Sequence, residues 1–144
     1  MRISVLAATL SAALCSLSAI AAGAEPIKYK ADLTGGAETP PTDSKATGTL
    51  SATYDEATHM LTWTVDYSGL TGPAVAAHFH GPAPAGKPAP IEVPLSPPLD
   101  SPMKGSAALT ESQAKDLTEG MMYFNIHTAA HKGGEIRGQL EKAM

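Results

Sequence analysis

The sequence predicts an all-β fold: an antiparallel, Greek-key-like β-sandwich or barrel with one short helix. Three observations predict it. Apolar and polar residues alternate over short segments, turns rich in glycine and proline separate these segments, and one stretch carries a helix-start signal. A chain of 144 residues is long enough for one such domain after its N-terminal segment is set aside.

The first 24 residues differ in character from the rest. They begin with Met1-Arg2, continue as an apolar run of small residues and end in Ala22-Gly23-Ala24, the A-x-A pattern of a secretory cleavage site. We expect residues 1–24 to be a cleaved signal peptide and residues 25–144 to be the mature domain. The protein would then be exported, either to the periplasm or out of the cell, with no membrane span after cleavage.

The composition of this mature domain excludes several kinds of site and partner. The single cysteine, Cys15, lies in the signal segment, so the mature domain would hold no disulfide and no thiolate metal site. The chain has 10 basic and 14 acidic residues, and removing Arg2 leaves 9 against 14, a formal net charge of −5. No basic cluster is present, and we therefore expect no nucleic-acid partner.

A β-hairpin is predicted between residues 49 and 67. Apolar and polar residues alternate over 49–54 and again over 61–67, and Asp55-Glu56-Ala57-Thr58 between them is typical of a turn. One face carries the apolar residues Leu50, Ala52, Tyr54, Leu61, Trp63, Val65 and Tyr67. Because the aromatic residues are in phase with that face, we expect them in the core rather than in a platform for sugars or peptides.

A third strand is predicted over 75–80. It places Val75, Ala77 and Phe79 toward the core and the two histidines, His78 and His80, on the other face. Prolines are so frequent from residue 81 to 102 that only a short edge strand around 91–93 is expected, because proline cannot donate to a strand ladder.

The last third of the chain begins with the helix. Thr110 as N-cap and Gln113 three residues later fit a capping box, and the helix is expected to end at Gly120. Two strands follow, with core faces formed by Met122, Phe124, Ile126 and by Ile136, Gly138, Leu140. Glu135 and Arg137 are expected to point outward and to pair with cross-strand neighbours, with Glu135 orienting a ligand histidine as the alternative.

Four histidines lie in two short, glycine-bounded segments. His78 and His80 are two apart and therefore share a strand face, while His127 and His131 follow a later apolar strand. Neutral imidazole is the commonest protein metal ligand. We predict a metal site of His78, His80 and His127, with His131 or water at the fourth position.

Copper is favoured over zinc at this predicted site, because the Irving–Williams order places copper first. A different interpretation needs no metal. The imidazoles of the His-Phe-His strand can donate hydrogen bonds to neighbouring loops and hold the Pro-rich segment 81–90 against the sheet. That segment favours an extended conformation and is itself a candidate surface for a protein or glycan partner.

Several motifs occur in order across the mature chain. They are Leu33-Thr34-Gly35-Gly36-Ala37-Glu38-Thr39-Pro40-Pro41, Ala46-Thr47-Gly48, Ser68-Gly69-Leu70, Ala77-His78-Phe79-His80-Gly81-Pro82, Leu109-Thr110, Ile126-His127-Thr128-Ala129 and Gly133-Gly134-Glu135-Ile136-Arg137-Gly138-Gln139. With them the chain resembles the CHRD domain family, named for chordin. The resemblance implies a secreted single-domain β-sandwich without a defined chemistry. His131-Lys132 departs from the asparagine and proline usual there, so the resemblance carries no ligand role to His131.

A weaker resemblance is to copper–zinc superoxide dismutase, and it implies that His78, His80 and His127 are copper-type ligands. The bridging histidine, the zinc-loop cluster and the arginine that guides superoxide have no counterpart, and Glu135 stands where that cation is expected. We therefore expect a binding module that is not an enzyme. The alternatives are a protein- or matrix-interaction module with structural histidines and a dismutase-like redox enzyme.

Overall fold

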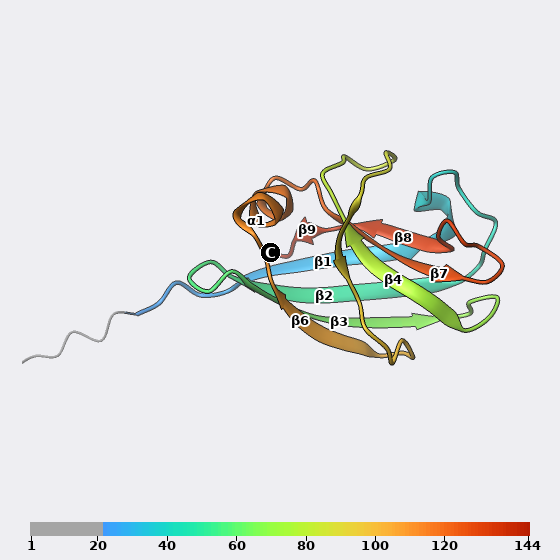
Figure 1. Ribbon diagram of the computed structural model, residues 1–144, viewed down its shortest axis with the longest axis horizontal. Coiled ribbons are helices and arrows are strands. Elements are labelled where there is room, and N and C mark those ends of the chain that lie inside the picture. Colours follow the sequence, from blue (N-terminus) through green and yellow to red (C-terminus); the bar gives the residue numbers. More distant parts are fainter. Residues whose placement is uncertain (1–21) are drawn as a thin grey trace, which may run out of the picture.

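The computed structural model describes residues 22–144. The expected signal peptide therefore lies outside the described residues except for its last three. Figure 1 shows the elements, which are β1 (Ile27–Thr34), the 3-10 helix η1 (Gly35–Ala37), β2 (Thr47–Asp55), β3 (Met60–Ser68), β4 (Ala74–His80), β5 (Ile91–Pro94), β6 (Met103–Ala108), α1 (Glu111–Thr118), β7 (Tyr123–Thr128), β8 (Ile136–Gln139) and β9 (Glu141–Lys142). Within 22–144, no helix is long and apolar enough to cross a membrane.

The strands form one antiparallel sheet that curls into a nearly closed sandwich. Their order is β5-β4-β7-β8-β1-β2-β3-β6, and β9 pairs with β1. The sheet folds over on itself, so that Trp63 of β3 meets Phe79 of β4 at a ring distance of 5.0 Å. The predicted fold class is confirmed, including the edge position of β5 and the capping box of Thr110 and Gln113 at α1.

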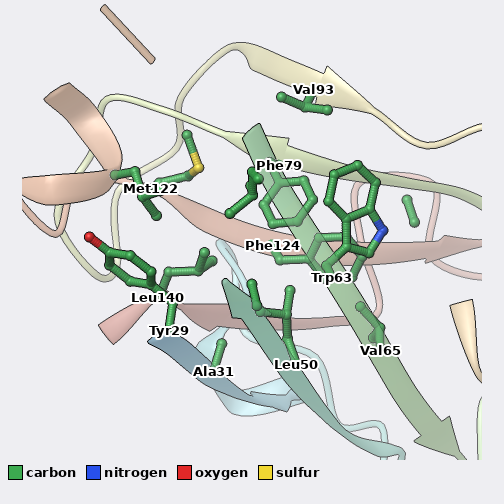
Figure 2. Packing of buried hydrophobic residues seen from close by; sticks show 14 of the residues in the cluster. Tyr29, Ala31, Leu50, Trp63, Val65, Phe79, Val93, Met122, Phe124 and Leu140 are labelled. Atoms are coloured by element: carbon green, nitrogen blue, oxygen red, sulfur yellow. The ribbon is translucent and has the colours of Figure 1, made fainter. Parts of the chain in front are cut away.

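The core lies between the two halves of the curled sheet. Figure 2 shows Trp63, Phe79 and Phe124 packed together there, with Leu50 of β2 below them and Tyr29 of β1 farther along the core beside Leu140. The rings of Phe79 and Phe124 are 4.9 Å apart and meet edge to face, a favourable arrangement for aromatic pairs. Trp63 and Tyr54 are buried, which confirms that they are core residues. Val75 is the exception, since 58% of it is exposed rather than turned into the core.

The other face of β4, β7 and β8 is polar, and two loops bury much of it. We call it the polar face; it carries His78, His80, Tyr123, Asn125, His127, Arg137 and Gln139. The Pro-rich loop 81–90 joins β4 to β5, and the 35–46 loop joins β1 to β2 (Figure 1). Backbone carbonyls of the 81–90 loop and side chains of the 35–46 loop bond to this face, so it forms a second, polar interior.

The expectation that Glu135 and Arg137 point outward is wrong: their exposed fractions are 0% and 2%. Neither forms the expected ion pair, and within residues 22–144 the recorded salt bridge joins Lys115 to Glu119. Arg137 instead donates to Thr39 Oγ1 (3.0 Å) and to the Lys87 carbonyl (2.7 Å), and thereby ties both loops to β8. The two loops cover these side chains. Alternation along a strand predicts the face on which a residue lies, but it does not predict that a distant loop covers that face.

Glu135 is held by donors from three separate segments. Its carboxylate accepts hydrogen bonds from Ser44 Oγ, from the backbone N–H and hydroxyl of Thr71, and from Thr128 Oγ1, at 2.7 to 3.0 Å. Burial by itself raises the pKa of a carboxyl, but these hydrogen bonds outweigh it and lower the pKa of Glu135. Glu135 therefore fastens loops and does not orient a histidine.

Candidate metal centre

Three of the four predicted ligands converge on the polar face. One nitrogen of each of His78, His80 and His127 lies within 4.8 Å of the corresponding nitrogens of the other two. The antiparallel register of β4 and β7 produces this grouping, because it pairs Ala76 with His127 and His78 with Asn125. A ligand from β7 thus comes next to two ligands that share one face of β4.

His80 is the most buried of the three, at 8% exposed. Its Nδ1 lies 3.0 Å from the carbonyl oxygen of Ala89, which accepts only, so Nδ1 carries the proton. The ring stacks on Tyr123 with centroids 4.7 Å apart and planes 5° apart. Burial lowers the pKa of His80 and favours the neutral ring.

His127 is fixed in the same way by the other loop. Its Nδ1 lies 2.8 Å from the carbonyl oxygen of Lys132 and donates to it. Such a bond at one ring nitrogen sets the tautomer and directs the lone pair of the other nitrogen to a metal. In the neutral form of these two rings, Nε2 of His80 and Nε2 of His127 carry no proton.

His78 is half-buried and lies nearer to solvent. Its Nδ1 is 3.1 Å from Nε2 of His127. Burial, and then the charges of His127 and His80, lower the pKa of His78 to about 4. At neutral pH this ring is uncharged and able to bind a metal ion.

Asn125 completes the group from the middle of β7. Its Oδ1 lies 3.0 Å from Nε2 of His80 and 3.0 Å from Nε2 of His127. Its Nδ2 donates to Oε1 of the buried Glu38 at 3.2 Å. Sequence reasoning placed Asn125 on the correct face but did not recognise it as part of the site; its position two residues before His127 was the available signal.

Glu38 reaches this site from the 35–46 loop. Burial raises the pKa of Glu38, while the hydrogen bonds from Asn125 and Thr39 and the charges of Arg137 and His127 act in the opposite direction. Gly134 makes the contact possible. A Cβ there would collide with Oε1 of Glu38 and lie 2.6 Å from Nδ2 of Asn125, and its φ of +120° also favours glycine.

His131 is not brought into the cluster. The backbone N–H of His131 donates to Thr128 Oγ1. His131 lines a separate cavity of about 480 Å³ together with Pro40, Asp43 and Gly134. The carboxamide oxygen of Asn125, and not His131, lies beside Nε2 of His80 and Nε2 of His127.

Fold and site together define an all-β module that carries a partly buried three-histidine cluster on its polar face. The family model of the CHRD domain matches residues 29–140. The chain belongs to the CHRD domain family, as the ordered motifs indicated. No curated protein and no solved structure matches the chain significantly, so the weaker resemblance to copper–zinc superoxide dismutase receives no support.

Proposed function

We propose that this protein is an exported module that binds a copper ion, or secondarily zinc, through His78, His80 and His127. One observation carries the proposal. Each neutral ring has a single proton, and in His80 and His127 that proton is used at Nδ1 by a backbone carbonyl. Each of the two Nε2 atoms then lies 3.0 Å from the oxygen of Asn125, and a cation stabilises such an arrangement of acceptors.

The choice of copper rests on the ligands. Three imidazoles without a thiolate suit Cu(II) or Zn(II), and copper is the stronger binder of the two. Export would remove the only cysteine, Cys15, together with the N-terminal segment. A metal site made entirely of imidazole fits an oxidising compartment, where thiolates are lost to disulfides.

A binding role is favoured over catalysis. Arg137 is the cation nearest in register to the cluster, but its guanidinium is buried, bonded to both loops and stacked on Tyr123. It does not offer the exposed positive charge that steers a small anion. The charge of Glu135 does not bear on this point, because hydroxyl and amide donors sequester that carboxylate away from the histidines.

A titration of the untagged protein with Cu(II), Cu(I) and Zn(II) tests the proposal. One equivalent should bind with sub-micromolar affinity, and His78→Ala and His127→Ala should each weaken it by about 100-fold, as loss of a ligand does. His59→Ala and His131→Ala are matched controls, since neither residue belongs to the cluster. The proposal would be overturned if no saturable binding were found, or if the two control substitutions weakened binding as much as His78→Ala and His127→Ala.

The Pro-rich loop supports a second candidate, a module that recognises a protein or glycan. Residues 84–88 are exposed, yet the loop is fastened by His80, by Arg137 and by the Ala89 N–H that donates to the Tyr123 hydroxyl. A fastened, exposed, Pro-rich segment loses little entropy on binding. Absence of metal binding, with a His80→Ala variant that is merely less stable, would favour this candidate.

A further inference from the structure

The polar face holds a fourth group whose geometry matches that of the histidines. Oδ1 of Asn125 is 3.0 Å from Nε2 of His80 and 3.0 Å from Nε2 of His127, and that nitrogen is 3.1 Å from Nδ1 of His78. Ligand atoms at about 2.0–2.2 Å from a tetrahedral ion lie roughly 3.3–3.6 Å apart. The three contacts are a few tenths of an ångström shorter than this spacing, so a small adjustment of the four atoms would admit an ion among them.

The orientation of the Asn125 amide is fixed from outside the cluster. Nδ2 donates to Oε1 of Glu38, which leaves Oδ1 on the side of the histidines. Glu38 is 3% exposed, so water does not compete for this bond. The absence of a side chain at Gly134 gives the carboxyl and the amide the room they share.

Hydrogen bonding among the described residues accounts for only part of this meeting of acceptors: Nδ1 of His78 can donate to Nε2 of His127, whereas no donor is found for Nε2 of His80 beside Oδ1 of Asn125. Oδ1 of Asn125 is an acceptor, and the Nε2 atoms of His80 and His127 are acceptors once their protons lie on Nδ1. Each short contact between acceptors costs energy unless a positive charge lies between them.

We infer that Asn125 supplies the fourth ligand of the metal centre through its carboxamide oxygen and that Glu38 is the positioning residue that holds this oxygen in place. The inference rests on the proposed metal-binding function and refines it. A centre of three nitrogens and one amide oxygen is harder than one of imidazole alone, and hard oxygen donors favour divalent ions over Cu(I). The site thus selects Cu(II) and Zn(II) against Cu(I).

The test compares the affinities of Cu(II), Zn(II) and Cu(I) for the untagged protein and for Asn125→Ala. Removing the oxygen should weaken Cu(II) and Zn(II) by about 10-fold or more and change Cu(I) by less than about threefold. Gln139→Ala is the matched control, because it removes another amide from the polar face that bonds only to backbone carbonyls. It should leave all three affinities unchanged.

Two substitutions of Glu38 separate its positioning role from its charge. Glu38→Gln keeps an oxygen that can accept from Nδ2 of Asn125 and should retain divalent affinity, whereas Glu38→Ala frees the amide and should weaken it by about 10-fold. Equal losses in both variants would assign the effect to charge and overturn the positioning role.

Failure of this inference and failure of the proposed function are distinguishable. If the unaltered protein binds metal and Asn125→Ala weakens all three ions together, or none of them, Asn125 is not a ligand while the histidine site stands. If the unaltered protein binds none of the three ions, both the proposed function and this inference are wrong.

Discussion

Nδ1 of His80 lies 3.0 Å from the carbonyl oxygen of Ala89, and through this bond one imidazole belongs both to the histidine cluster and to the attachment of the Pro-rich loop. The two interpretations of the His-Phe-His strand, metal ligand and loop anchor, therefore apply to the same ring. His78 differs, because its short contact within the described residues is with His127. The two histidines of this strand are predicted to respond differently to substitution.

Without metal, His80→Ala should lower the free energy of unfolding by about 2–4 kcal/mol, because it empties a buried site and leaves the Ala89 carbonyl with only the long hydrogen bond from the Tyr123 hydroxyl, at 3.4 Å. His78→Ala, the matched control on the same strand, should cost less than about 1 kcal/mol. Chemical denaturation in the presence of a chelator measures both. Amide hydrogen exchange at Ala83, Lys87 and Ala89 should accelerate in His80→Ala alone, and equal acceleration in both variants would contradict a special role for His80.

Glu135→Gln should be among the more damaging single substitutions in the chain. Oε1 accepts from Ser44 and from the Thr71 N–H, so an amide NH₂ at that position would face a backbone donor. Oε2 accepts from two hydroxyls, and an NH₂ there would make both hydroxyls accept and would lose the charge of the carboxylate. We expect a loss of about 3 kcal/mol in the free energy of unfolding. Glu141→Gln, at an exposed position in β9, is the control and should change it by less than about 0.5 kcal/mol.

The lowered pKa of Glu135 also sets a pH dependence. Its carboxyl binds a proton less readily in the folded state than in the unfolded state. The stabilisation is therefore complete above the unfolded pKa of about 4.3 and is lost as pH falls through the lower folded value. In Glu135→Gln, the free energy of unfolding should lack this contribution and fall less steeply as pH decreases below about 4.3. If the variant and the unaltered protein lost stability equally in acid, the assignment to Glu135 would be wrong.

Local patterns accounted for much of the fold. The hairpin of β2 and β3, the edge strand β5 and the helix start at Thr110 follow from alternation, proline placement and capping, which depend on neighbouring residues only. Three strands were missed, and one of them is the two-residue β9. β1 alternates clearly, with Tyr29, Ala31 and Leu33 buried, and could have been found, whereas β6 reads Met-Lys-Gly-Ser-Ala-Ala and has little contrast between its faces.

Only part of the candidate site was predicted, because the rest depends on contacts between residues that are far apart in the sequence. Strand periodicity places His78 and His80 on one face, and only the register between β4 and β7 brings His127 and Asn125 to them. The burial of Glu38, Glu135 and Arg137 depends on loops that fold over the polar face from distant parts of the chain. Such coverage leaves no periodic signal, so charged residues on an outer strand face were expected to be solvated.

Gly138→Ala tests how closely β8 approaches β1. A Cβ at Gly138 would collide with the backbone carbonyl oxygen of Asp32 and lie 2.9 Å from Cδ2 of Leu33. Because a backbone atom cannot yield as a flexible side chain does, we expect a loss of about 1–3 kcal/mol in the free energy of unfolding. Gly36→Ala is the matched control, with no atom within 4 Å of the added Cβ. Thermal unfolding measures both variants, and an equal decrease in their melting temperatures would exclude the close approach of β8 to β1 as the cause.

Glu92 and Glu135 are predicted to make the free energy of unfolding depend on pH in opposite directions. Burial, followed by the hydrogen bond and the negative charge of Asp116, raises the pKa of Glu92 to about 8. Oε2 of Glu92 is buried and has no donor among the described residues, so a proton shared with Asp116 stabilises the pair. In the unfolded chain the same carboxyl titrates near 4.3.

Between these two values the folded protein holds a proton that the unfolded chain has released. The free energy of unfolding should therefore fall as pH rises from about 4.5 to about 8, with a slope from this group of at most about 1.4 kcal/mol per pH unit. Glu92→Gln should flatten that slope, because an amide keeps the hydrogen bond to Asp116 at every pH. Glu56→Gln in the exposed β2–β3 turn removes the same charge and should leave the slope unchanged. Denaturant titrations at closely spaced pH values would refute the shared proton if the Glu92→Gln and unaltered proteins gave parallel curves.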